Sequence, residues 1–196
     1  MPGNDKSMFA LIGASNHSDN DREEWDYYAT DPVAGELLLG IETFSDNLWE
    51  CACGEGHLSK VFEANGFHVR STDLIDRGYG EGGVDFLLCT EPFDGDIVTN
   101  PPYKYAKEFV EKAIELVTDG HKVAMLLKLQ FLEGKARREL FDRFPPKTIW
   151  VSTKRINCCK NGDFGSEQRK NNSAQAYAWY IWEKGYAGPT TVRWFN

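Results

Sequence analysis

Residues 48–65 read LWECACGEGHLSKVFEAN, and this stretch decides the fold class. Its apolar beginning predicts a strand that runs into a Gly-x-Gly turn at Gly54 and Gly56. Apolar side chains between positions 58 and 64 then follow the spacing of a helix. Glycines at such a turn let a ligand lie against bare backbone at the N-terminus of the helix. The third glycine of a dinucleotide fingerprint is missing, so the turn does not favour a pyrophosphate ligand.

An acidic residue accompanies each of the next two predicted strands. The strand over residues 67–72 ends at Asp73, nineteen positions after Gly54. That offset is close to the ~20 residues at which an acidic side chain reaches a pair of ribose hydroxyls. A short strand is predicted over residues 84–88, where Asp85 either accepts from an adenine amino group or is a solvated turn residue.

The tetrapeptide Asn100-Pro101-Pro102-Tyr103 closes the predicted strand 96–99 and indicates chemistry on a planar amino group. Such a nitrogen is a poor nucleophile because its lone pair is delocalised, and two acceptors for its hydrogens would free that lone pair. The Asn100 side-chain oxygen and the Pro101 carbonyl are suitable acceptors. The prolines stiffen the loop, and Tyr103 offers a face on which a planar substrate can stack. The alternative is a plain turn, since Asn and Pro are common turn formers.

The remaining pattern continues an alternation of strands and helices. We expect helices over residues 104–118 and 133–144 and strands over residues 123–129, 148–152 and 176–182. The first of these strands is apolar apart from Lys128, as expected in the buried middle of a parallel sheet. No helical pattern separates the other two strands, so they are predicted to be antiparallel. The predicted fold class is a three-layer α/β domain with a mostly parallel sheet, an antiparallel last strand and ligands at the carboxyl ends of the strands.

In this order, the motifs resemble those of S-adenosylmethionine-dependent amino-methyltransferases, most of all the adenine-N6 DNA methyltransferases of phages and bacteria. The resemblance covers about residues 25–184 and implies a Rossmann-like class I methyltransferase fold. The stretch YYATDP, residues 27–32, is similar to the family's N-terminal motif, whose Thr lies near the methionine carboxylate. The cofactor-binding residues that the resemblance implies are Tyr28, Thr30, Glu50, Cys51, Cys53, Gly54, Gly56, Asp73, Asp85 and Phe86.

Within that set, the resemblance implies that Glu50 lies near the methionine end, Asp73 on the ribose and Asp85 on the cofactor adenine. It assigns the loop Asn100-Pro101-Pro102-Tyr103 to the base that is methylated. We therefore expect transfer of a methyl group from S-adenosyl-L-methionine to N6 of adenine in DNA. RNA base amino-methyltransferases and protein-glutamine methyltransferases use a similar loop and remain alternatives. A cofactor-binding module without catalysis is less favoured, because the tetrapeptide is intact.

The charge distribution bears on the substrate. The net charge of −8 is one-sided, because residues 1–103 hold 5 basic and 20 acidic residues while residues 104–196 hold 17 and 10. The basic half favours nucleic acid over a protein amide, and a solvated surface explains it about as well. The expected DNA contacts are Arg137, Arg138, Lys154 and Arg155, with Phe164 either stacking on an extruded base or packing its loop onto the core.

The spacing of the motifs bears on sequence specificity. Only forty-four positions separate Gly56 from Asn100, and only twelve residues follow Lys184. Neither place has room for a large target-recognition domain. We therefore expect specificity that is short, loose or supplied by a partner.

Length and composition suit a flexible arm over residues 1–24 followed by one domain over residues 25–196. No apolar run approaches the ~20 residues that span a bilayer, and no signal-peptide pattern is visible. We therefore expect a cytoplasmic protein of a bacterium or phage-infected cell, with no membrane partner. Five cysteines, an odd number, suit reduced thiols. Cys51-x-Cys53 and Cys158-Cys159 lack the two-residue gap typical of structural zinc sites, so no metal is expected.

Overall fold

The computed structural model describes residues 28–156, 158–160 and 175–196. The predicted arm over residues 1–24 and Phe164 lie outside the described residues, and so does the side chain of Tyr28. Within the described ranges, no helix is both long enough and apolar enough to cross a bilayer.

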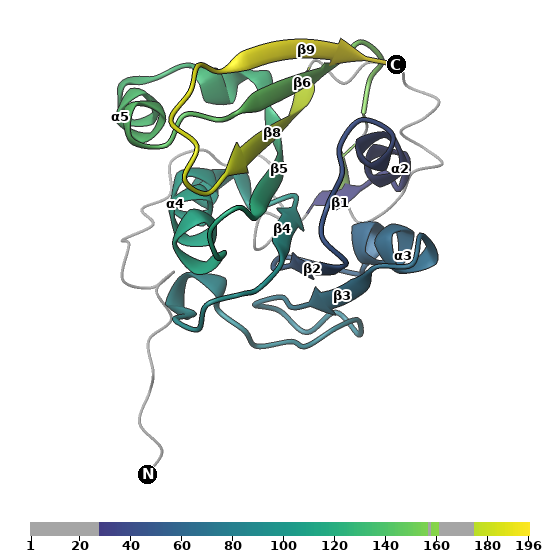
Figure 1. The fold of residues 1–196 in the computed structure, drawn as a ribbon. Helices are drawn as coiled ribbons and strands as arrows, with labels where there is room; N and C mark the ends of the chain where they lie inside the picture. Colours follow the sequence, from purple (N-terminus) through teal and green to yellow (C-terminus); the bar gives the residue numbers. More distant parts are fainter. Residues whose placement is uncertain (1–27, 157, 161–174) are drawn as a thin grey trace, which may run out of the picture.

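One seven-stranded sheet forms the middle layer, in the order β3-β2-β4-β5-β8-β6-β9 (Figure 1). Its strands are β2 (Asn47–Glu50), β3 (His68–Ser71), β4 (Asp96–Thr99), β5 (Lys122–Lys128), β6 (Thr148–Ser152), β8 (Tyr177–Glu183) and β9 (Thr191–Phe195). Strands β3, β2, β4 and β5 are parallel, β8 runs antiparallel to β5 and β6, and β9 is parallel to β6. The predicted mixed α/β fold and the antiparallel pairing of β6 with β8 are confirmed. The antiparallel strand is not the last one, because β9 follows it and forms the edge of the sheet.

Helices cover both faces of the sheet and complete the three layers (Figure 1). The helices are α2 (Val33–Leu39) and α3 (His57–Ala64) on one face, and α4 (Ala106–Leu116) and α5 (Lys135–Arg143) on the other. Side chains alternate along β5, as they do in any strand. Val123, Met125 and Leu127 join the core on the α4 side, whereas Ala124 and Leu126 join the core on the α2 side. Both faces of β5 are therefore buried, which explains its nearly continuous apolar sequence.

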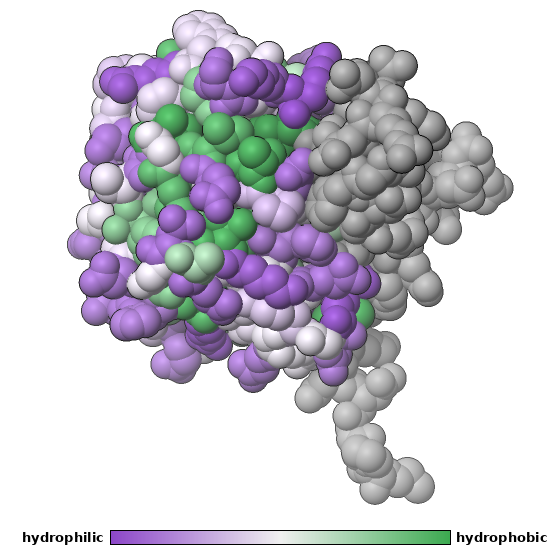
Figure 2. Space-filling model, turned by 90° about the vertical axis from the view of Figure 1, so that its right-hand side faces the viewer, coloured by the Kyte–Doolittle hydropathy of each residue, from purple (hydrophilic) through white to green (hydrophobic). Residues whose placement is uncertain are grey.

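Figure 2 shows the side of the molecule that carries α2 and α3, where apolar side chains reach the surface between hydrophilic ones. Val33, at the start of α2, is 43% exposed. Leu37, one helical turn later, is partly buried against the core. This helix layer therefore leaves part of its apolar face at the surface.

Residues 84–88 do not form the strand that the sequence predicts. The structure has instead a 3-10 helix, η2 (Phe86–Leu88), and Asp85 Oδ1 accepts from the backbone N–H of Leu87 at 3.1 Å. An Asp side chain that bonds the backbone two residues further on favours a turn and competes with strand pairing. Phe86 is 2% exposed and packs in the core on the α4 side.

The helices predicted over residues 104–118 and 133–144 are confirmed as α4 and α5, and each begins two residues later than predicted. The helix predicted over residues 104–118 starts as a 3-10 turn, η3 (Tyr103–Tyr105), and continues as α4. The helix predicted over residues 133–144 is preceded by a second 3-10 turn, η4 (Leu129–Leu132). Gly134 then separates η4 from α5 with a φ of 114°, a backbone conformation that glycine adopts readily.

A second, two-stranded sheet is not predicted by the sequence. Strand β1 (Tyr28–Thr30) pairs antiparallel with β7 (Cys158–Lys160), and Thr30 lies opposite Cys158. Three residues are too few for an alternating pattern to be recognisable. The pairing brings two segments from opposite halves of the chain together.

Candidate active site

The predicted functional side chains gather at the edge of the sheet where β2, β3, β4 and β5 end. Glu50 is the last residue of β2, Asp73 follows β3 and Asn100 follows β4. Lys128, which the sequence does not predict as a site residue, is the last residue of β5 at the same edge. Parallel strands end at the same edge, which is where ligands bind in open α/β sheets. The end of β6 lies at this edge too, since β5 and β6 are both antiparallel to β8.

Asp73 holds the Gly-x-Gly turn against the end of β3. One of its carboxylate oxygens accepts from the backbone N–H of Gly54 at 2.8 Å, and the other accepts from that of Ile75 at 2.9 Å. Gly54 has a φ of 55°, in the left-handed region that favours glycine. Because an ionised carboxylate offers about four lone-pair positions, Asp73 keeps acceptor capacity for the hydroxyls of a ligand.

The ring of Tyr79 covers the second glycine of the turn. A Cβ atom at Gly56 would lie 2.2 Å from that ring, and the φ of Gly56 is 76°. The Tyr79 hydroxyl donates to Glu63 Oε1 at 2.9 Å. Burial, followed by the hydrogen bond to Glu63, raises the pKa of Tyr79 to about 12. Gly56 therefore makes room for a side chain of this chain, a role that the sequence does not predict.

Glu50 is 3% exposed and is bonded to the first turn of α3. Its Oε2 accepts from the backbone N–H of Ser59 at 2.8 Å and from the Ser59 hydroxyl. Burial raises the pKa of Glu50 to about 8, against the opposing effect of the Ser59 hydrogen bonds. Burial likewise raises the pKa of Cys53 to about 12 and that of Cys51 well above its usual range, so both thiols are neutral. Among the described residues, no three His, Cys, Asp or Glu side chains are grouped to hold a metal ion.

The two-stranded sheet orients the side chain of Asn100. Asn100 Nδ2 donates to Thr30 Oγ1 at 2.9 Å and lies 4.0 Å from Cys158 Sγ. Thr30 is 5% exposed. Nδ2 is the donor end of the carboxamide, so this contact turns the acceptor end, Oδ1, away from Thr30. The structure thus joins two residues that the sequence assigned to different parts of the site.

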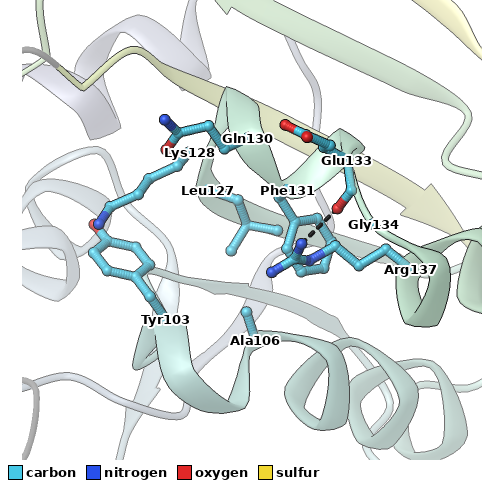
Figure 3. Close-up of a pocket in the computed structure, with 9 residues that line it drawn as sticks. All are labelled: Tyr103, Ala106, Leu127, Lys128, Gln130, Phe131, Glu133, Gly134 and Arg137. Atoms are coloured by element: carbon cyan, nitrogen blue, oxygen red, sulfur yellow. Dashed lines mark hydrogen bonds between the residues drawn. The ribbon is translucent and has the colours of Figure 1, made fainter. Parts of the chain in front are cut away.

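Tyr103 borders a cavity of about 510 Å³ (Figure 3). Its ring centroid lies 6.0 Å from that of Tyr177, and Lys128 Nζ lies 4.5 Å from the Tyr103 centroid. Burial raises the pKa of the Tyr103 hydroxyl well above its usual range, so the group stays protonated. The lining includes the aromatic Tyr103 and Phe131, the basic Lys128 and Arg137, the polar Gln130 and the acidic Glu133.

One of the four basic residues predicted to contact DNA lines this cavity. Arg137 places Cζ 5.2 Å from the ring centroid of Phe131. Arg138 is exposed and ion-paired within α5. Lys154 and Arg155 are exposed just after β6, at the same edge of the sheet as the cavity. Lys154 and Arg155 therefore share an edge of the sheet with the cavity, and of the four predicted residues Arg137 is the one that lines it.

Four residues that the sequence does not predict as site residues contact the predicted ones. They are Ser59, Tyr79, Lys128 and Tyr177. Lys128 had a usable signal, because it is the one charged residue in the apolar strand predicted over residues 123–129. The other three have no local signal, since only folding brings them to their partners.

No protein-family model and no curated protein sequence matches the chain. Solved structures do match it. A candidate class I S-adenosylmethionine-dependent methyltransferase from Listeria monocytogenes gives a TM-score of 0.56 at 13% identity, over 83% of this chain and 63% of the other. A candidate RNA methyltransferase from Pyrococcus horikoshii gives 0.54 at 16% identity, over 90% and 96%. A modification subunit of a candidate type I restriction enzyme from Vibrio vulnificus gives 0.55 at 12% identity, over 84% and 45%.

The chain has the class I methyltransferase fold. The Rossmann-like architecture expected from the sequence is thereby confirmed. The chain spans less than two thirds of the length of the Listeria and Vibrio proteins. At such low identities the likeness concerns the fold alone, so the reaction has to be argued from the side chains at the carboxyl ends of the strands.

Proposed function

We propose that the protein is an S-adenosylmethionine-dependent methyltransferase that acts on N6 of adenine in DNA. The observation that carries the proposal is the position of Asn100 and Tyr103 at the end of β4. Strand β4 lies between β2, which leads into the Gly-x-Gly turn, and β5, which borders the cavity. A cofactor on the turn and a planar amine in the cavity would therefore meet beside the Asn100-Pro101-Pro102-Tyr103 loop.

The residues around the turn fit S-adenosylmethionine. Gly54 presents bare backbone, and Asp73, which already holds the turn, has further acceptor positions for the ribose hydroxyls. Glu50 and Thr30 would border the methionine end. Asp85, which caps η2, would border the adenine, with Phe86 supporting that segment from the core. The cofactor, when bound, supplies a methyl carbon activated by a sulfonium, which is an electrophile for a nitrogen nucleophile.

The chain's own contribution is to prepare the target nitrogen. The Asn100 Oδ1 atom and the Pro101 carbonyl would each accept one hydrogen of the amino group, which draws the nitrogen toward tetrahedral geometry and frees its lone pair. The bond between Asn100 and Thr30 supports this role, because it engages the donor end of the carboxamide. Tyr103 would stack on the base. These groups are held in place before the substrate arrives, which lowers the barrier without further reorganisation.

Positive charge around the cavity favours nucleic acid as the substrate. Lys128 and Arg137 line the cavity, and Lys154 and Arg155 lie at the same edge of the sheet. Contacts to phosphates position a strand without reading its sequence, so we expect short or loose specificity. An adenine in a duplex would have to be extruded to reach Tyr103, at a cost of a few kcal/mol. Single-stranded or distorted DNA, in which extrusion costs less, would therefore also be a substrate.

The test offers DNA, RNA and protein side by side to the purified protein with methyl-labelled S-adenosylmethionine. We expect N6-methyladenine in DNA at many sequence contexts, and labelling that is slower by about 10²-fold or more with Asn100→Ala. Label confined to RNA or to protein glutamine would replace DNA by that substrate class. No label in any of the three, with the cofactor bound, would indicate a binding module without catalysis.

A further inference from the structure

The Lys128 ammonium lies over the ring of Tyr103 at the border of the cavity. Its Nζ lies 4.5 Å from the ring centroid, and both side chains line the cavity (Figure 3). Residues 123–127, which precede it in β5, are buried. The strand therefore fixes the backbone of Lys128, while its long side chain carries the charge out over the ring.

Among the described residues, the Lys128 ammonium contacts the Tyr103 ring. In the part of the chain that the structure describes, none of the ion pairs includes Lys128. A contact between a cation and an aromatic ring at a partly exposed site is weaker than the stacking of a nucleobase on such a ring. An entering base can therefore displace the ammonium from Tyr103.

We propose that the Lys128 ammonium occupies the place of the target base while the site is empty, and moves to a backbone phosphate when the base enters. The inference rests on the proposed function, in which a base stacks on Tyr103. A base that belongs to a strand brings phosphates with it, so the displaced cation gains a new partner. A free nucleoside brings none, and its entry leaves the cation without compensation. Lys128 would thus make the site select an adenine within a strand over free adenosine.

The experiment compares two ligands across matched variants. The first ligand is adenosine, with S-adenosylhomocysteine saturating the cofactor site, and the second is a short single-stranded oligonucleotide. Lys128→Met removes the charge at similar length, and Lys128→Arg keeps it. Lys107→Met is the charge control, since Lys107 pairs with Glu111 on α4 at 4.0 Å.

For Lys128→Met we expect adenosine to bind about two- to fivefold more tightly, because the competing cation is gone. The oligonucleotide should bind more weakly, with the slope of log affinity against log salt reduced by about one. Lys128→Arg and Lys107→Met should bind adenosine as the wild type does. In the Tyr103→Ala background, adding Lys128→Met should not tighten adenosine binding, because the ring for which the ammonium and the base compete is absent.

Unchanged or weaker adenosine binding by folded Lys128→Met would overturn the inference. So would a gain of the same size in Lys107→Met, or one that persists without the Tyr103 ring. Thermal unfolding shows whether each variant is folded. All of these readouts are binding measurements, so they are separate from the failure of the proposed function, which would appear as absent methyl transfer by the wild type.

Discussion

Asn100 and Thr30 are 70 positions apart in the sequence, and a hydrogen bond of 2.9 Å joins their side chains. Thr30 reaches Asn100 because β1 is paired with β7, beside the end of β4. The family resemblance implies that Thr30 lies near the methionine end of the cofactor. The contact places the same hydroxyl on the amide that we propose to be catalytic. Under the proposed function, Thr30 would therefore connect the cofactor part and the substrate part of the candidate site.

Thr30→Val tests this connection, because it removes the hydroxyl at nearly constant size. Losing the hydrogen bond should lower the rate of methyl transfer at saturating cofactor by about tenfold, while Thr30→Ser stays near the wild type. Single-turnover kinetics give this rate, and Thr118→Val is the control, since its hydroxyl bonds Asp94 at 3.1 Å on the opposite edge. A change confined to cofactor affinity would assign Thr30 to the cofactor alone.

Gly56→Ala tests the packing of Tyr79 against the glycine turn. The new Cβ would lie 2.2 Å from the Tyr79 ring, at a φ of 76°. Gly66→Ala is the matched control, with a φ of 91° and nothing within 4 Å of its Cβ. Both variants carry the strain of a left-handed residue, about 1–2 kcal/mol. Only Gly56→Ala adds overpacking, typically about 1–3 kcal/mol, and equal losses in urea unfolding would mean that the Tyr79 ring is not fixed there.

Asp73→Ala tests the cofactor site. It removes a charged acceptor from the proposed ribose contact and releases the backbone of Gly54. The affinity for S-adenosylmethionine should fall about tenfold or more. Calorimetric titration measures this affinity, with Asp76→Ala as the control, because exposed Asp76 bonds only the backbone of its own loop at Gly78. An unchanged affinity in folded Asp73→Ala would remove this residue from the cofactor site.

Glu50 makes the stability of the fold depend on pH. Burial raises its pKa from 4.5 to about 8 in the folded protein. Between these values the folded state holds a proton that the unfolded chain has lost, so the free energy of unfolding falls as the pH rises through this window. Glu50→Gln removes the titration and should lose less stability than the wild type across the same window. Denaturant titrations at both ends measure the difference, and exposed Glu36→Gln should follow the wild type.

The central strands could be predicted from the sequence because a strand buried on both faces has mostly apolar residues. Strand β5 is buried on both faces, so its residues 123–127 form an apolar run, and buried β4 contributes the apolar pair Ile97 and Val98. Strand β9 is exposed at four of its five residues, and β1 and β7 have three residues each. Strands β1 and β7 are too short to carry a hydrophobic pattern, and the apolar Val192 and Trp194 of β9 alternate with polar residues but are exposed. The strand predicted over residues 84–88 was wrong, because the Asp85 side chain accepts from the local backbone and favours a turn.

The same distinction applies to the candidate site. The positions of Gly54, Asp73 and Asn100 at this edge of the sheet were predictable, because each residue lies within four positions of the end of a predicted strand. The partners of these residues depend on long-range contacts. Tyr79 folds back onto the glycine turn, and Tyr177 lies against Tyr103 only because β8 enters the sheet beside β5. The spacing of residues in the sequence predicts neither of these two contacts.

The most direct test of the account is the rate of methyl transfer to DNA by Asn100→Ala, measured in a single turnover at saturating S-adenosylmethionine. Loss of one preorganised acceptor should lower this rate by about 10² or more, while the affinity for the cofactor stays near normal. Asn65→Ala is the matched control and should leave the rate unchanged, since the Asn65 side chain donates to the Val61 carbonyl at the end of α3. A folded Asn100→Ala variant that methylates DNA at the wild-type rate would contradict the account.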